Sequence, residues 1–348
     1  MFKSKKIIFT FLSLIGTISM ADACTRILYD NGGHKYITGR TMDWKYDVET
    51  NIWIFPAGIK RDGATGKNTM NWTSKYGSVI ASGYDVSTTD GLNEKGLAAN
   101  LLWLAESQYP TPKENDKTLS LSMWAQYILD NYESVEEAVS ALKKEPLVVI
   151  TKQVPGQDRM GTVHLSLSDK SGDSAIIEYI NGKQIIYHNK DYVVMTNSPE
   201  YGEQLTLNNY WKDIGGQVML PGTNRAVDRF VRASYYNSAI EKTDNLDEGV
   251  ASVFSVMKTV TVPYGIKSEN AEVNLSSTRW TTVIDHTRDL YFFQSAVMPN
   301  IFWIDLKKVD LSKETGKILK LDLGKNQSNT YIGEVNSSFH IAEPMKFL

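Results

Sequence analysis

The sequence has 348 residues, a formal net charge of −3 at pH 7 and 42% hydrophobic residues. A chain of this length can bury one large core or two smaller ones. No block of like charge indicates nucleic acid or an anionic membrane surface as a partner. The single cysteine excludes an internal disulfide and any CxxC metal site.

The first 23 residues are typical of a cleaved export leader. Three lysines near the start precede an apolar run over residues 7–18, and residues 21–23 (ADA) form a small-x-small cleavage site. The apolar run is shorter than the roughly 20 residues that a membrane span needs. We therefore predict a signal peptide over 1–23, a single hydrolase domain over 24–348, and a protein exported to the periplasm or the medium. No membrane association is expected after leader removal. An uncleaved anchor and a lipoprotein leader are the alternatives.

Cys24 directly follows this cleavage site. Cleavage after Ala23 would place a thiol and a free α-amine on the same residue. An α-amine titrates near roughly 7.7–8.0 and a free thiol near about 8.5, so a proton can pass between them near neutral pH. A leftover cysteine in an exported protein indicates intermolecular pairing or a reactive thiol. Because Cys24 directly follows the cleavage site, the reactive thiol is favoured over intermolecular pairing. Cys24 is therefore the predicted nucleophile of an amide hydrolase.

The rest of the chain predicts strands, then helices, then strands. The expected strands cover 25–29, 35–39, 51–55, 78–84, 97–104, 163–167, 174–179, 184–188, 192–195, 280–284, 289–294 and 300–306. The expected helices cover 119–131, 135–144, 224–239 and 247–260. This order, without βαβ alternation, predicts an α+β fold. The last residues, 341–348, carry no informative pattern.

Five segments of the chain resemble one family. They are CTR at 24–26, GRTMDW at 39–44, GLNEKGL at 91–97, TNSP at 196–199, and LPG at 220–222 followed by RFVR at 229–232. In this order and spacing, the chain resembles the choloylglycine hydrolases. That family contains the conjugated bile-salt hydrolases and the penicillin V acylases, which are N-terminal-nucleophile hydrolases of non-peptide amides. The resemblance implies a four-layer αββα fold with two stacked antiparallel sheets between helical layers.

The resemblance also implies roles for individual residues. Cys24 would attack the amide carbonyl to form a thioester, with its own α-amine acting as base and then as acid. Arg40 would lie near the thiol, where positive charge favours the thiolate, and Asp43 would orient the α-amine. Asn197 would donate to the oxyanion, and Arg229 would be the second arginine of the active site. A structural salt bridge is the alternative for the arginines and Asp43, and a turn is the alternative for Asn197.

The chain departs from the family pattern at two places. Many members carry Asn or Tyr where this chain has Trp103, whose indole cannot accept a hydrogen bond. We therefore expect Trp103, like Trp44, to be a wall of the substrate pocket, with ordinary core packing as the alternative. The loop between Asn197 and Leu220 looks shorter than in many bile-salt hydrolases, where it aids tetramer assembly. The resemblance implies a homotetramer, and this shorter loop argues against it.

The predicted function is a secreted amidohydrolase that cleaves conjugated bile acids or penicillin V as small-molecule substrates. An N-acyl-homoserine-lactone acylase and a non-catalytic exported binding protein are the alternatives. The joint presence of Cys24, Arg40, Asp43 and Asn197 favours an enzyme. A papain-like Cys/His enzyme would need its cysteine on a helix, whereas Cys24 lies in a strand-like context. The five scattered histidines form no HxxxH or HExxH pattern, so neither a metal nor a cofactor is expected.

Overall fold

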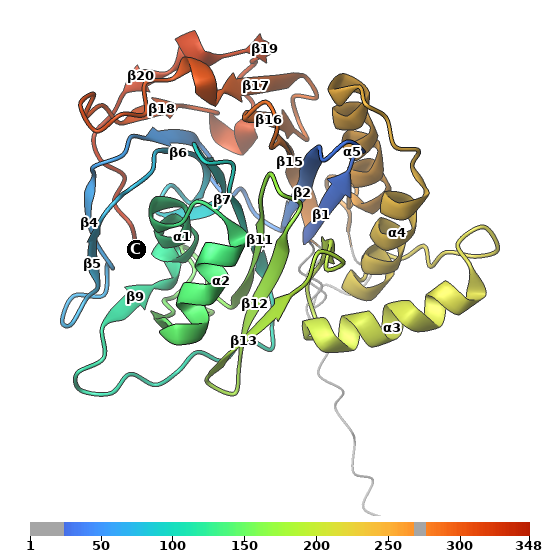
Figure 1. Ribbon diagram of the computed structural model, residues 1–348, viewed down its shortest axis with the longest axis horizontal. Coiled ribbons are helices and arrows are strands. Elements are labelled where there is room, and N and C mark those ends of the chain that lie inside the picture. The colour runs from blue at the N-terminus through green and yellow to red at the C-terminus, as the bar shows by residue number, and fades with distance from the viewer. Residues whose placement is uncertain (1–23, 268–275) are drawn as a thin grey trace, which may run out of the picture.

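The computed structural model describes residues 24–267 and 276–348 (Figure 1). The predicted leader lies outside the described residues. Within the described ranges, no helix is long and apolar enough to cross a membrane. Two large sheets face each other, and helices pack on the outer side of each sheet (Figure 1). The expected α+β class and its four-layer αββα arrangement are therefore confirmed.

The described chain starts in the first sheet, where β1 is the second strand in spatial order. Its strands, in spatial order, are β14 (Val194–Met195), β1 (Cys24–Asp30), β2 (Tyr36–Trp44), β15 (Ser277–Asp285), β16 (Leu290–Ser295), β17 (Ile301–Asp305) and β19 (Gly333–Glu334). All neighbours pair antiparallel except β17 and β19, which are parallel.

The second sheet is wider and wholly antiparallel. Its strands, in spatial order, are β13 (Lys183–His188), β12 (Ser174–Ile180), β11 (Val163–Ser168), β8 (Ala98–Trp103), β7 (Ser87–Asn93), β6 (Ser78–Gly83), β3 (Ile52–Phe55), β18 (Leu319–Leu321) and β20 (His340–Ile341). Two small pairs lie beside it, antiparallel β4 (Lys60–Asp62) with β5 (Asn71–Thr73) and parallel β9 (Thr118–Ser120) with β10 (Val148–Ile150).

The helices form the two outer layers. On the second sheet lie α1 (Trp124–Asn131) and α2 (Val135–Lys144), and on the first lie α4 (Ala226–Ala239) and α5 (Leu246–Val260). The start of α2 is capped, because Ser134 Oγ accepts the Glu137 amide at 3.2 Å, and Glu137 Oε2 accepts the amide of Glu133, one residue before the cap, at 2.7 Å.

Two expectations about helices are wrong. A helix was expected to begin at residue 119, but β9 and a one-turn 3-10 helix (Leu121–Met123) occupy that stretch and α1 begins at Trp124. Residues 118–120 pair with β10 instead of joining the helix, although the apolar residues from 119 onward have helical spacing. The stretch from Asn197 to Leu220 was expected to be a loop, but it contains α3 (Tyr201–Ile214). The buried face of α3 includes Gln204 and Asn208, so it carries no apolar stripe that would indicate a helix.

The alternation of side chains along β1 divides the site between two layers. Arg26 Nη2 donates to the Leu167 carbonyl of β11 at 3.1 Å, so this face of β1 looks toward the second sheet. Thr25 lies on the opposite face and accepts from Arg229 of α4. In β2, Gly39 allows α5 to approach, since a Cβ there would lie 2.6 Å from Val253 Cγ1. Strands β1 and β2 are therefore in contact with the helices on one face, and β1 is in contact with the second sheet on the other.

Candidate active site

Cys24 begins β1 and is almost fully buried, with 2% of its surface exposed. Its Cα lies opposite Met42 in the neighbouring strand β2. The Cys24 backbone nitrogen donates to Asn197 Oδ1 at 2.6 Å. Its Sγ accepts the Asp43 amide at 3.4 Å. The nitrogen of Cys24 is therefore held by the segment that follows β14, and its sulfur is held by β2.

Arg229 links Cys24 to Asn197 from the helical layer. It is fully buried on α4, and its Nη1 donates to the Cys24 carbonyl and to Thr25 Oγ1, both at 2.6 Å. Its Nη2 donates to Asn197 Oδ1 at 2.8 Å. Because a guanidinium only donates, the atom of Asn197 that faces it must be the oxygen. The orientation of the Asn197 carboxamide is thereby fixed.

Asn197 follows β14 and holds a carbonyl of β8 with its nitrogen. Its Nδ2 donates to the Trp103 carbonyl at 2.7 Å. Gln204 Nε2 of α3 donates to the Asn197 carbonyl at 3.0 Å, and His164 Nε2 lies 2.8 Å from the Thr196 carbonyl just before it. The backbone around Asn197 is thus fixed from two sides. Its role as oxyanion donor stays a prediction.

Asp43 is fully buried at the end of β2. Its Oδ1 accepts from Thr278 Oγ1 at 2.5 Å and its Oδ2 accepts from Thr41 Oγ1 at 3.3 Å. Burial raises the pKa of this carboxyl to about 6, although Arg229 and the Thr278 hydroxyl oppose the shift. The acid therefore changes charge close to neutral pH, beside the Cys24 thiol. Its expected contact with the α-amine stays a prediction.

Arg40 lies between the two sheets near the thiol. Its Nη2 donates to the Leu101 carbonyl at 2.9 Å, its Nη1 lies 3.9 Å from Asp90 Oδ2, and its guanidinium lies 4.5 Å from the Trp280 ring centroid. Burial raises the pKa of Cys24 to about 11, and the charge on Arg40 is the strongest influence in the opposite direction. The position of Arg40 therefore suits the expected stabilisation of a thiolate.

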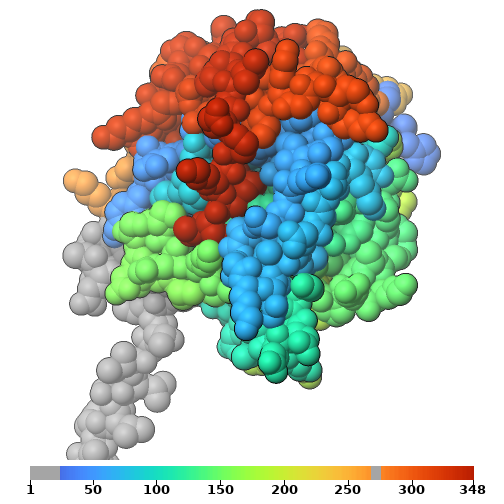
Figure 2. Space-filling view, turned by 90° about the vertical axis from the view of Figure 1, so that its left-hand side faces the viewer, coloured from blue at the N-terminus to red at the C-terminus, as the bar shows by residue number. Residues whose placement is uncertain are grey.

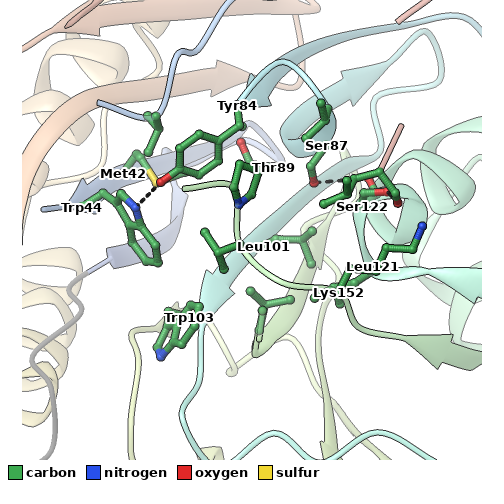
Figure 3. Close-up of a pocket in the computed structure, with 18 of the residues that line it drawn as sticks. Met42, Trp44, Tyr84, Ser87, Thr89, Leu101, Trp103, Leu121, Ser122 and Lys152 are labelled. Atoms are coloured by element: carbon green, nitrogen blue, oxygen red, sulfur yellow. Dashed lines mark hydrogen bonds between the residues drawn. The ribbon is translucent and has the colours of Figure 1, made fainter. Parts of the chain in front are cut away.

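A cavity opens at Cys24, and we call it the thiol cavity. Cys24, Arg40 and Met42 are among its lining residues, and Figure 3 shows Trp44 and Trp103 on one side and Leu121, Ser122 and Lys152 on the other. Its volume is about 150 Å³. Most of its lining side chains are apolar, so it suits an apolar substituent next to a reactive thiol.

The two tryptophans form one connected wall of the thiol cavity. Their ring centroids lie 5.4 Å apart, and the Arg159 guanidinium lies 4.5 Å from the Trp44 ring and 4.3 Å from the Trp103 ring. Trp44 Nε1 donates to the Tyr84 hydroxyl at 2.6 Å, which also accepts from Gln157 Nε2 at 2.9 Å. Tyr84 and Arg159 could not be predicted as part of the site, because neither lies in a recognisable motif.

One group of side chains has ligands for a metal ion among the described residues. Glu136, Asp173 and His188 offer ligand atoms within 4.8 Å of one another. His188 Nε2 lies 2.8 Å from Asp173 Oδ2. The group comes from α2, from the residue before β12 and from β13, and it has no residue in the lining of the thiol cavity. An ion there would not reach the thiol.

The comparisons with known proteins agree with this fold. Residues 24–326 match the family described as linear amide C-N hydrolases, choloylglycine hydrolase family. A penicillin V acylase from Pectobacterium atrosepticum is 53% identical over 97% of this chain and 94% of its own length. The solved structure of penicillin V acylase from Agrobacterium tumefaciens is 59% identical, with a TM-score of 0.87 over 93% of this chain and 99% of that chain.

A more distant structure shares the fold alone. A variant of conjugated bile acid hydrolase from Clostridium perfringens is 22% identical, with a TM-score of 0.74 over 89% of this chain and 100% of that chain. The fold is that of the N-terminal-nucleophile hydrolases, and the enzyme class is a hydrolase of linear amide C–N bonds. The chain belongs to the choloylglycine hydrolase family.

Replacing Arg40 with Gln should raise the pKa of the Cys24 thiol. The substitution removes the charge that most strongly opposes the effect of burial. At a fixed pH below the thiol pKa, the thiolate fraction falls about tenfold for each unit of increase. The rate of Cys24 alkylation by iodoacetamide, followed by mass spectrometry across a pH series, measures the shift. Lys313→Gln, at a side chain that is 74% exposed, is the control. Superimposable pH profiles for Arg40→Gln and the control would contradict this assignment.

Proposed function

We propose that this amidohydrolase cleaves the phenoxyacetyl amide of penicillin V, with Cys24 as the nucleophile. The observation that carries the proposal is the size of the apolar cavity at the thiol. Its volume is about 150 Å³, and engineered apolar protein cavities of about 150 Å³ bind benzene. That space suits one aryl ring rather than the fused rings of a bile acid. The two penicillin V acylases that resemble this chain support the same choice.

The chemistry of the proposal needs no group from outside the chain except water. The α-amine takes the proton of the Cys24 thiol, and Sγ attacks the amide carbonyl. The C–N bond breaks to leave a thioester, and the α-amine gives the proton to the departing amine. Water then hydrolyses the thioester. The Asn197 carboxamide nitrogen has two hydrogens, and only one is needed for the Trp103 carbonyl. In this proposal the second hydrogen binds the oxyanion.

The base in this proposal exists only if the chain begins at Cys24. We infer that residues 1–23 are an export leader that is removed after Ala23. Two observations support this inference: the family match begins at residue 24, and the Cys24 nitrogen lies 2.6 Å from a buried acceptor. Arg229 and Asn197 then hold the new terminus in β1.

Intact mass spectrometry of protein recovered from the periplasm or medium should show the loss of residues 1–23. The expected product begins at Cys24 with an unmodified α-amine, because acylation would remove the base. An unprocessed chain, or a lipid on Cys24, would contradict the proposed mechanism and favour an anchored protein.

Turnover of a substrate panel should identify the amide. We expect penicillin V to be hydrolysed with a higher kcat/KM than glyco- and tauro-conjugated bile acids or N-acyl-homoserine lactones. Cys24→Ala should abolish all of these activities, because it removes the nucleophile and little volume. Preferred turnover of a bile acid or a lactone would replace the proposed substrate, and turnover by Cys24→Ala would contradict the nucleophile.

Trp103→Ala provides a control on the wall of the cavity. If Trp103 binds the acyl group without taking part in the chemistry, the substitution should raise KM for penicillin V and leave kcat nearly unchanged. Loss of kcat at unchanged KM would place Trp103 in the catalytic machinery instead.

Assembly into a homotetramer remains a prediction. The outer side of α3 and the segment after it expose four large apolar side chains: Leu207, Tyr210, Val218 and Met219. Sedimentation equilibrium of the processed protein measures the oligomeric state directly. A monomer at all concentrations would remove tetramer assembly from the proposal.

A further inference from the structure

We propose that Leu348 is the residue that limits the length of the acyl group in the thiol cavity. This inference rests on the proposed function, because it concerns the acyl side of the same site. Leu348 lies 324 positions from Cys24 in the sequence, yet both residues line the thiol cavity. No sequence motif covers residues 341–348.

The segment 342–348, which we call the C-terminal tail, is anchored along its length. It follows β20, and the Ala342 amide donates to the Ile318 carbonyl at 2.9 Å. Met345 is buried, and Phe347 packs against Phe55 with ring centroids 6.5 Å apart. Figure 2 shows the tail in dark red, running down one face of the molecule. The tail therefore reaches the cavity in a defined position.

Leu348 itself is held by three hydrogen bonds. Its amide donates to the Val86 carbonyl at 3.1 Å. Its carbonyl accepts from Ser120 Oγ at 2.5 Å and from Ser122 Oγ at 2.7 Å. Ser120 and Ser122 belong to β9 and the 3-10 turn that replace the start of the expected first helix. Hydrogen bonds on both sides of the residue fix where its side chain can lie.

Leu348 lines two spaces. One is the thiol cavity, and the other is a hollow of about 780 Å³ lined by residues 151–157, Met160 and Leu348, which we call the outer hollow. Leu348 is 36% exposed despite its three hydrogen bonds, in keeping with empty space beside it. The segment containing Lys152, Gln153, Val154 and Pro155 is the only other part of the described chain that lines both spaces.

In this proposal, the Leu348 side chain separates the thiol cavity from the outer hollow and thereby limits the length of the acyl group sterically. An acyl chain that starts at Cys24 and extends along the cavity meets Leu348 before it reaches the outer hollow. Up to that point, each added methylene that is buried increases affinity about fourfold. Beyond it, a longer chain gains nothing unless the Leu348 side chain moves. A smaller residue at position 348 would join the two spaces, and a larger one would shorten the cavity.

Protection of Cys24 from alkylation tests this limit without any turnover. Straight-chain carboxylic acids of increasing length, with phenoxyacetate as the aryl reference, compete with iodoacetamide for the only thiol in the chain. The wild-type protein should show affinity that rises with chain length and then levels off. Leu348→Ala should continue to rise about fourfold per methylene beyond that length, and Leu348→Trp should level off at a shorter length.

Ile341→Ala is the matched control, because Ile341 precedes the same tail but is 65% exposed and lines neither space. It should reproduce the wild-type profile. Circular dichroism and thermal melting establish that each variant is folded. The opposite directions expected for Ala and Trp separate a steric limit from general damage to the tail.

The proposal is overturned if Leu348→Ala and the wild type level off at the same length, or if no acid protects Cys24 in either protein. These outcomes are independent of penicillin V turnover. A wild-type protein that hydrolyses penicillin V but shows no shift with Leu348→Ala contradicts only the role of Leu348. A protein with the expected shift that does not hydrolyse penicillin V contradicts only the proposed substrate.

Discussion

A buried guanidinium fixes the first described residue of the first strand. Arg229 of α4 contacts the Cys24 carbonyl, the Thr25 hydroxyl and the Asn197 side-chain oxygen, and so joins a helix to the two strands that meet at the thiol. Burying a charged group is costly unless its hydrogen bonds are replaced. The bonds replacing them here end on β1 and on Asn197, the second residue after β14. A displaced Arg229 would therefore disturb the nucleophile and its neighbours together.

Charged and polar groups lie between the two sheets, next to an apolar cavity. Asp90 accepts from the Tyr291 hydroxyl at 2.5 Å and from Asn100 Nδ2 at 2.7 Å, and it faces Arg40 across 3.9 Å. These hydrogen bonds hold the Asp90 carboxylate in one position between the sheets, and Arg40 is held by its bond to the Leu101 carbonyl. The charge of Arg40 thus has a fixed position near the thiol, while most of the side chains that line the thiol cavity are apolar.

Features with strong local signals could be predicted from the sequence, and features made by distant contacts could not. The expected helix over 135–144 matches α2, which begins at Val135, and family motifs selected five residues that the fold gathers around the thiol. Helix α3 was missed because two polar residues, Gln204 and Asn208, lie on its buried face, and Gln204 is held there by a hydrogen bond to the Asn197 carbonyl; this breaks the apolar period. Leu348 was missed because nothing local distinguishes a leucine that lines a cavity from one that lies on a surface.

The single cysteine has a consequence for redox chemistry. Cys24 is the only thiol in the chain, so a sulfenic acid formed at this sulfur has no internal partner with which to condense to a disulfide. Recovery would require an external thiol that can enter an apolar cavity and reach a residue of which only 2% is exposed. Oxidants small enough to enter the cavity can still reach the Cys24 sulfur. The burial of the Cys24 thiol therefore also hinders the repair of this nucleophile.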